Sequence, residues 1–256
     1  MLVCLDIGNT SASYGIHTGK VWKHIGYVPS FDIPRFIPKL LKSEKANPHI
    51  EFIVSSTVPQ ITHKIGNLVA KNKPFKRRLR LWVVGGNLKP KIKHNYRHIN
   101  KLGKDRLVNA YGAARIYGAP LLILDYGTAL TCDYLSEKGV FAGGLIIPGP
   151  EIAFKALCDR ATLLPKISFP KGSFPLLGRD TRAGMKAGIL QGYGAMTDGL
   201  VERFRRRYGR KFRVVATGGL AKAIYPYTSR VDVLDPLLTL KSLVRIFKDR
   251  AKKQAP

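Results

Sequence analysis

Residues 2–10 read Leu2-Val3-Cys4-Leu5-Asp6-Ile7-Gly8-Asn9-Thr10, an apolar run that ends in an acid, a glycine and small polar side chains. Such a run predicts a buried strand that delivers the Asp6 carboxylate to a tight turn. Gly8 has no Cβ to block a ligand, the polar side chains after it can donate to phosphate oxygens, and Asp6 offers a hard oxygen to a cation. The alternative is an ordinary strand end, in which Asp6 caps its own loop.

The same pattern returns near the middle of the chain as Leu121-Leu122-Ile123-Leu124-Asp125-Tyr126-Gly127-Thr128. Two further strand-like segments follow each copy, separated by the turns Thr18-Gly19-Lys20 and Glu137-Lys138-Gly139. Each half of the chain therefore opens with a predicted three-strand meander that has an Asp-Gly turn between its first two strands. Two such halves facing each other would bring two acids to one phosphate chain.

Composition indicates a folded globular enzyme. The chain has 256 residues, of which 45% are hydrophobic, enough for one large domain or two modest ones. It has no run of about 18 apolar residues and no basic segment followed by an apolar one at the N-terminus, so we expect neither a membrane span nor a signal peptide. The scattered cysteines, Cys4, Cys132 and Cys158, favour buried reduced thiols in a cytoplasmic protein.

The net charge is strongly basic. Lys and Arg number 44 against 16 Asp and Glu, which gives +28, with basic runs at 71–80, 203–213 and 245–253. Such a field attracts polyanions, including nucleic acid, and steers anionic substrates inward. The simpler interpretation is a solvated basic surface without a dedicated partner, since the runs lack regularly spaced aromatic residues and match no nucleic-acid-binding motif.

Strands and helices alternate after each meander, which predicts helices on both faces of a mixed sheet. In the first half we expect a helix over 34–42 that proline breaks early, a strand over 51–56, a helix over 61–71, a strand over 79–84 and a helix over 107–117. In the second half we expect helices over 152–158, 183–207 and 237–253 and a strand over 212–217.

Two turns outside the meanders carry candidate functional residues. Asp105, in Gly103-Lys104-Asp105-Arg106, either caps the following helix or accepts a proton, with Arg106 beside it to hold an anionic substrate. The strand over 212–217 ends in Thr217-Gly218-Gly219, where flat backbone lets an adenine or ribose lie close. The plain alternative for the double glycine is a strand-to-helix turn.

Taken in order, these motifs resemble those of the type III pantothenate kinase family, within the acetate kinase, sugar kinase, Hsp70 and actin superfamily. The resemblance runs nearly end to end. The matching motifs are Asp6-Ile7-Gly8-Asn9-Thr10, Gly103-Lys104-Asp105-Arg106, Asp125-Tyr126-Gly127-Thr128-Ala129, Gly143-Gly144 with Pro148-Gly149, Gly178 with Thr181, and Thr217-Gly218-Gly219.

The resemblance implies an α/β fold of two ribonuclease-H-like lobes of the actin-like ATPase type, with a nucleotide cleft between them. The first lobe, 1–118, holds a phosphate turn and the acceptor loop; the second, 119–256, holds another phosphate turn, an adenosine motif and a dimer helix. The implied activity is ATP-dependent phosphorylation of pantothenate to 4'-phosphopantothenate, the first step of coenzyme A biosynthesis. The implied assembly is a homodimer with the pantothenate pocket at the subunit interface.

The resemblance also assigns roles to residues. Asp105 is the general base, Asp125 binds a monovalent cation, K+ or NH4+, and Asp6 helps to place Mg2+ on the phosphates of ATP. The predicted ATP contacts are Asp6, Ile7, Gly8, Asn9, Thr10, Ser11, Ala12, Ser13, Thr128, Gly218 and Gly219. The predicted pantothenate contacts are Tyr96, Gly103, Lys104, Asp105, Arg106 and Thr181.

Some residues depart from the family pattern. Lys104 stands where alanine is common, and Tyr126 stands where phenylalanine is usual. None of the departures removes a required acid, so they bear on substrate affinity more than on reaction type. Two other functions stay open: a nucleic-acid-associated or regulatory protein on the same scaffold, or a related small-molecule kinase with another acceptor.

Overall fold

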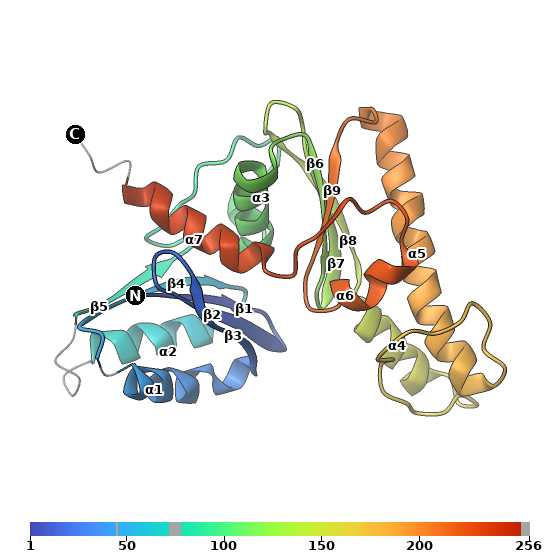
Figure 1. Ribbon diagram of the computed structural model, residues 1–256, viewed down its shortest axis with the longest axis horizontal. Coiled ribbons are helices and arrows are strands. Elements are labelled where there is room, and N and C mark those ends of the chain that lie inside the picture. Colours follow the sequence, from blue (N-terminus) through green and yellow to red (C-terminus); the bar gives the residue numbers. More distant parts are fainter. Residues whose placement is uncertain (45, 72–77, 252–256) are drawn as a thin grey trace. The chain divides into compact units, whose positions relative to one another are not determined.

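The computed structural model describes residues 1–44, 46–71 and 78–251. Most of the basic run 71–80 and the end of the run 245–253 therefore lie outside the described residues. The chain divides into two compact units, each built on a five-stranded mixed sheet (Figure 1). The first unit comprises Met1–Ile92, Arg97–Gly112 and the C-terminal helix, and the second comprises Lys93–Tyr96 and Ala113–Leu237. The prediction of two α/β lobes is confirmed.

The first sheet has the strand order β3-β2-β1-β4-β5, in which β1 is central. Its strands and helices are β1 (Leu2–Ile7), β2 (Ser11–His17), β3 (Trp22–Pro29), α1 (Ile33–Ser43), β4 (His49–Ser56), α2 (Pro59–Ala70), β5 (Arg78–Val83), the first part of α3 (Lys104–Tyr117) and α7 (Leu238–Ala251). The pairs β1–β2 and β2–β3 are antiparallel, which confirms the predicted meander. The pairs β1–β4 and β4–β5 are parallel. Because β1 is covered on both faces, its run 2–5 is buried without alternation.

Helices cover both faces of the first sheet. Figure 1 shows α1 and α2 on one face and α7 on the other, where α7 contacts β1, β2 and β4. Helix α1 corrects one expectation, because it continues through Pro38 instead of breaking there. The side chains of Ile33, Ile37, Leu40 and Leu41 are buried along one side of α1, and this burial offsets the backbone hydrogen bond that proline cannot make.

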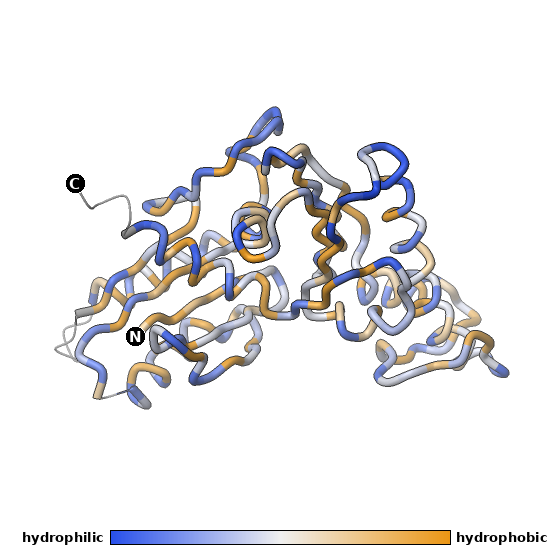
Figure 2. Tube along the Cα trace, turned by 45° about the horizontal axis from the view of Figure 1, so that its top comes forward, coloured by the Kyte–Doolittle hydropathy of each residue, from blue (hydrophilic) through white to orange (hydrophobic). Residues whose placement is uncertain are grey.

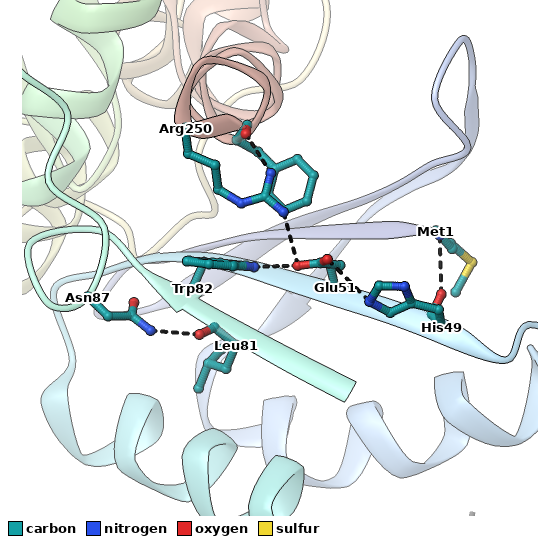
Figure 3. Close-up of polar contacts among 8 residues, drawn as sticks. Met1, His49, Glu51, Leu81, Trp82, Asn87 and Arg250 are labelled. Carbon is teal, nitrogen blue, oxygen red and sulfur yellow. Dashed lines mark hydrogen bonds and ion pairs between the residues drawn. The ribbon is translucent and has the colours of Figure 1, made fainter. Parts of the chain in front are cut away.

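A buried carboxylate joins α7 to the first sheet (Figure 3). Glu51 on β4 is 8% exposed and accepts hydrogen bonds from the Trp82 indole and, at 3.3 Å, from the Arg250 guanidinium on α7. The same guanidinium lies 4.6 Å from the centre of the Trp82 ring. Removing one charged partner of such a pair leaves the other buried and uncompensated, so this contact specifies where α7 docks.

The second sheet repeats the design with the strand order β10-β9-β6-β7-β8. Its elements are β6 (Leu121–Tyr126), β7 (Ala129–Leu135), β8 (Phe141–Pro148), α4 (Pro150–Arg160), α5 (Thr181–Tyr208), β9 (Arg213–Thr217), α6 (Ala221–Ile224) and β10 (Val233–Leu234). Antiparallel β6–β7 and β7–β8 form the second predicted meander, and β9 lies parallel to β6. Side chains of α5 such as Leu190, Tyr193 and Val201 pack into the core of this unit. Figure 2 shows apolar strands in each unit and a hydrophilic stretch at the end of α5.

The division into units differs from the expected boundary at residue 118 in three respects. Helix α7, expected in the second lobe, packs within the first unit, and both 93–96 and 113–118, expected in the first lobe, lie with the second unit. The sequence of α7 predicts an apolar face but not the sheet that this face covers. In the structure α7 contacts β1, β2 and β4 of the first sheet. No helix within the described ranges is long and apolar enough to cross a bilayer.

Candidate functional site

The first Asp-Gly turn is closed by backbone and by one serine. Gly8 N–H donates to Ser11 O at 3.1 Å, and Ser30 Oγ donates to Gly8 O at 2.7 Å. Asp6 makes no hydrogen bond to its own turn within the described residues, so the loop-capping alternative finds no support. The side chains at Asn9, Thr10 and Ser11 are exposed, which leaves their donors available to a ligand.

Asp6 and Asp105 interact, although about a hundred residues separate them in the sequence. Burial first, and then the negative charge of Asp105, raise the pKa of Asp6 to about 7, while the neighbouring Ser55 hydroxyl opposes the rise. In the first unit, Asp6 of the first Asp-Gly turn therefore lies within electrostatic reach of Asp105 in the loop 103–106.

The loop 103–106 shows how Asp105 contributes to the start of α3 and leaves its role as a proton acceptor open. Helix α3 begins at Lys104, three residues earlier than expected, and Gly103 O accepts the N–H of Leu107 at 3.2 Å. Asp105 Oδ1 accepts the N–H of Arg106 at 2.8 Å, so one carboxylate oxygen does serve the helix terminus. Oδ2 has no hydrogen bond within the described residues, and the carboxylate is half-buried. The side chain of Arg106 is itself buried.

Lys104 is directed along the loop. Its ammonium group donates to Asn100 O at 3.3 Å. Its alkyl chain passes Gly85, where an added Cβ would lie 2.6 Å from Lys104 Cε. Gly85 has φ +84°, so it provides both the turn after β5 and the room for this lysine. The cation that departs from the family pattern is thus bound to backbone instead of to the Asp105 carboxylate.

The second Asp-Gly turn gathers three segments around Asp125. Gly218 has φ +95°, and a Cβ at that position would lie 2.4 Å from Asp125 Oδ1. Gly149 N–H donates to Thr128 O at 3.1 Å, and a Cβ at Gly149 would lie 2.3 Å from Gly127 O. The second unit therefore brings the predicted residues Asp125, Thr128 and Gly218 together. Gly219 is exposed, and nothing lies within 4 Å of a Cβ built there.

The hydroxyl contacts of Tyr126 explain how the second turn accommodates a tyrosine where phenylalanine is usual. Its hydroxyl lies 2.6 Å from Thr197 Oγ1 on α5, and Thr197 Oγ1 donates to Tyr193 O at 2.7 Å. Tyr126 is therefore the donor to Thr197. Burial raises the pKa of Tyr126, so the hydroxyl stays protonated. The additional polar group is satisfied internally and ties the second turn to α5.

The predicted pantothenate contacts are divided between the units. Gly103, Lys104, Asp105 and Arg106 belong to the first unit, and Tyr96 and Thr181 belong to the second. The Tyr96 ring centre lies 5.8 Å from that of Phe141. Thr181 is the exposed first residue of α5, a helix that Asp180 caps by accepting the N–H of Ala183 at 2.8 Å.

Sequence reasoning missed two hydroxyls beside the acids. Ser55 on β4 pairs with Asp6, and Thr217 on β9 pairs with Asp125. In each half the sequence shows a hydroxyl residue at the end of the strand that lies parallel to the acid-bearing strand. Only the register between the two strands shows that this hydroxyl lies beside the acid.

The acids fit the cations that they are expected to hold. No group of three or more His, Cys, Asp or Glu suited to a metal occurs among the residues that the structure describes. Mg2+ in nucleotide sites is usually held by one or two carboxylates together with phosphate oxygens, so single carboxylates suffice. A buried hydroxyl next to each carboxylate adds an oxygen of the same hard type.

Two five-stranded mixed sheets, each with an acid–glycine turn after its first strand, define the actin-like ATPase and sugar kinase class of fold. The family model for type III pantothenate kinase matches residues 2–203. The chain belongs to the type III pantothenate kinase family.

Individual relatives agree with this membership. The type III pantothenate kinase of Bacillus cytotoxicus is 36% identical, over 98% of this chain and 97% of that protein. Among solved structures, a protein described as a conserved "putative Baf family transcriptional activator" from Campylobacter jejuni has a TM-score of 0.59 at 18% identity, over 98% of this chain and 99% of its own. Component A of (R)-2-hydroxyglutaryl-CoA dehydratase from Acidaminococcus fermentans has a TM-score of 0.51 at 13% identity, covering 98% of each chain. At these identities the solved structures show the fold alone.

Proposed function

We propose that this protein transfers the γ-phosphoryl group of ATP to the primary hydroxyl of pantothenate, which gives 4'-phosphopantothenate in the first step of coenzyme A biosynthesis. The observation that carries the proposal is membership of the type III pantothenate kinase family. The effect of the Asp105 charge on the pKa of Asp6 supports it, because it links the proposed phosphate turn to the proposed acceptor loop within the first unit.

Phosphoryl transfer passes through a loose transition state, so the protein mainly positions groups and neutralises charge. In the proposal, the turn 6–13 binds the phosphates, and Thr128 contacts the same nucleotide. Gly218 and Gly219 contact its adenosine, and the open space beside Gly219 accommodates it. Tyr96, Gly103, Lys104, Arg106 and Thr181 bind pantothenate, and Asp105 Oδ2 accepts the hydroxyl proton as the oxygen bonds to phosphorus.

Two cations complete the proposed site. Mg2+ on the phosphates would neutralise the charge that builds up during transfer, and the Asp6 carboxylate is the group to hold it. The Asp125 carboxylate would hold K+ or NH4+.

The direct test is a coupled assay of ADP release, run with and without pantothenate and with K+ against a large inert cation. We expect release that depends on both. Release stimulated by another small alcohol but not by pantothenate would favour the related kinase instead, and release without any acceptor would count against acceptor phosphorylation.

The raised pKa of Asp6 predicts proton-linked nucleotide binding. Since Mg2+ binds the ionised carboxylate, binding of MgATP near pH 7 should release a proton from Asp6, and affinity should rise with pH between about 6 and 8. The folded, ligand-free protein favours protonated Asp6, so this stability contribution is complete below the unfolded pKa and is lost as pH rises through about 7. Calorimetry in buffers of different ionisation enthalpy measures the proton count.

Asp105→Asn is the matched control, because it removes the nearby negative charge and lowers the pKa of Asp6. Its proton release at pH 7 should be smaller than that of the wild type. Equal proton release in both proteins would contradict the electrostatic coupling of the two acids.

We extend the proposal to a homodimer formed through α5. Gly184, Gly188, Gly192 and Gly199 are exposed along this helix, and nothing lies within 4 Å of a Cβ built at any of them. Each glycine inside a helix costs about 1 kcal/mol relative to alanine, so four in one helix suggest close backbone approach by a partner. Exposed Ile146 and Ile152 in the same unit add apolar area.

Gly188→Leu should therefore convert the dimer to a monomer, measured by light scattering coupled to size-exclusion chromatography. The control Lys39→Leu adds the same side chain at an exposed helical position of the first unit and should leave the mass unchanged. A Gly188→Leu protein that keeps the wild-type mass would rule out this face.

The net charge of +28 keeps one alternative in view, a nucleic-acid-associated protein. The simpler interpretation, a solvated basic surface, has structural support. Arg205, Arg206 and Arg207 lie in the last turn of α5, where cations interact favourably with the helix dipole. A duplex-binding titration separates the two: sub-micromolar affinity at physiological salt favours the alternative, and binding that vanishes with salt indicates non-specific attraction.

The three buried free cysteines suit a reducing compartment, so we extend the proposal to a cytoplasmic location.

A further inference from the structure

The two acid-bearing turns share a feature that lies beside the carboxylates. In the first sheet Asp6 pairs with Ser55 on the parallel neighbour strand and with Ser13 on the antiparallel one. In the second sheet Asp125 pairs with Thr217 and Thr131 in the same two directions. Paired residues of adjacent strands project to the same face of a sheet, so each acid lies between two hydroxyl side chains.

One hydroxyl of each pair is buried and unsatisfied. Ser55 is 0% exposed and Thr217 is 1% exposed, and neither hydroxyl has a hydrogen-bond partner in the structure. The Ser55 hydroxyl is near enough to Asp6 to lower its pKa as a hydrogen-bond donor, although the contact falls outside strict hydrogen-bond geometry. Across the described residues, the other buried polar side-chain atoms in this condition are His49 Nε2 and Arg205 Nε. A buried hydroxyl that lacks a hydrogen-bond partner by strict geometry therefore occurs at the equivalent position of both sheets.

A buried hydroxyl without a partner is costly, and natural proteins rarely keep one without a use. Here each unsatisfied oxygen adjoins a carboxylate that the proposed function assigns to a cation. Thr131, on the other side of Asp125, already donates to Asp133 Oδ2 at 3.4 Å, so the two flanking hydroxyls are not equivalent. The unsatisfied hydroxyl is the one on the parallel strand in both units.

We propose that Ser55 and Thr217 are positioning residues whose hydroxyls donate to the carboxylates of Asp6 and Asp125 in the cation-bound protein and hold those carboxylates in their binding orientation. The inference rests on the proposed function for the identity of the two cations. In the second unit the Thr217 hydroxyl gains its hydrogen bond only when the site is filled, and in the first unit the existing contact of Ser55 with Asp6 closes to full hydrogen-bond geometry. Both residues act through the acids and do not contact the reacting atoms.

This arrangement predicts opposite effects in the empty and the filled protein. Replacing an unsatisfied hydroxyl with an apolar group of similar shape is nearly neutral or stabilising, so Thr217→Val should melt at the wild-type temperature or above it without K+. With K+, titrated at constant ionic strength against tetramethylammonium and with ADP held constant, Thr217→Val should lose most of the K+-dependent rise in melting temperature. Its apparent K+ affinity should fall about tenfold, the scale of one hydrogen bond to a charged group.

The controls separate positioning from general damage. Thr217→Ser keeps the hydroxyl and should keep the K+ response, and Thr131→Val removes a hydroxyl that has another acceptor and should also keep it. For the first unit, Ser55→Ala should reduce the rise in melting temperature produced by Mg2+ with ADP. Ser56→Ala, one residue along β4, loses only the two hydrogen bonds that Ser56 Oγ makes with Val58, one to Val58 O and one from Val58 N–H, and should not.

A full K+ response in Thr217→Val, together with a full Mg2+ response in Ser55→Ala, would overturn the inference. Loss of the response in Thr217→Ser as well would overturn it too, because the hydroxyl would then be irrelevant. A wild-type protein whose melting temperature ignores both cations would refute the cation assignment and this inference with it, while ADP release with pantothenate would still stand as an independent result.

Discussion

Asp105→Asn should reduce turnover by about 100-fold or more, the usual scale for a lost general base, while nucleotide binding stays close to that of the wild type. The substitution is well matched to the structure. Asparagine retains an Oδ1 that can accept the Arg106 N–H, so the start of α3 keeps its hydrogen bond. The change removes the basic oxygen and the negative charge and little else.

The two interpretations of Asp105 therefore predict different outcomes from one variant. If Asp105 only serves the helix terminus, the Asp105→Asn protein should support normal turnover. If the carboxylate accepts the pantothenate proton, turnover falls while the melting temperature stays near the wild-type value. Steady-state ADP release, calorimetric binding of MgATP and a thermal melt give the three readouts, and Lys104→Ala controls for changes in loop charge.

Gly149→Ala should weaken ATP binding at least tenfold and lower the free energy of unfolding by roughly 2 kcal/mol, within the range for overpacking a closely packed site. The added methyl group would lie 2.3 Å from Gly127 O and 2.4 Å from Thr128 O. Both contacts are with backbone, so relief requires moving the second phosphate turn itself. The backbone at Gly149 has φ −70° and ψ 158°, which any residue adopts, so the effect arises from space alone.

Gly66→Ala is the matched control, because its added Cβ would meet only Leu81 Cδ2, at 3.9 Å. It should leave ATP affinity unchanged and, within α2, slightly raise stability. Calorimetric titration with ATP and urea denaturation measure the two quantities. If Gly149→Ala bound ATP with wild-type affinity, ATP binding would not depend on the observed position of the Gly127-Thr128 turn.

Much of the fold could be predicted from sequence, because its strongest signals are local. The duplicated run of apolar residues before Asp6 and Asp125 predicts both meanders, and the observed strands match them. The expected helices form with ends shifted by a few residues, as at α3. Such shifts follow from capping, which depends on backbone geometry more than on residue type.

The site was harder to predict where residues meet only through tertiary structure. The motifs marked Asp6, Asp105 and Asp125, but not the electrostatic contact of Asp6 with Asp105. Ser55 belonged to no motif, and Thr217 belonged to one but was given no role of its own, since the importance of both hydroxyls depends on strand register. The direction of the Lys104 side chain depends on Gly85, a residue that sequence analysis had no reason to connect with the acceptor loop.

The docking of α7 affects how the chain is made. The first unit combines strands from residues 2–83 with the helix over 238–251, so the face that α7 covers lacks this helix until the ribosome has also produced the second unit. The second unit, nearly continuous in sequence, can mature earlier. A nonsense codon shortly before α7 would therefore leave the first sheet open to proteases and aggregation.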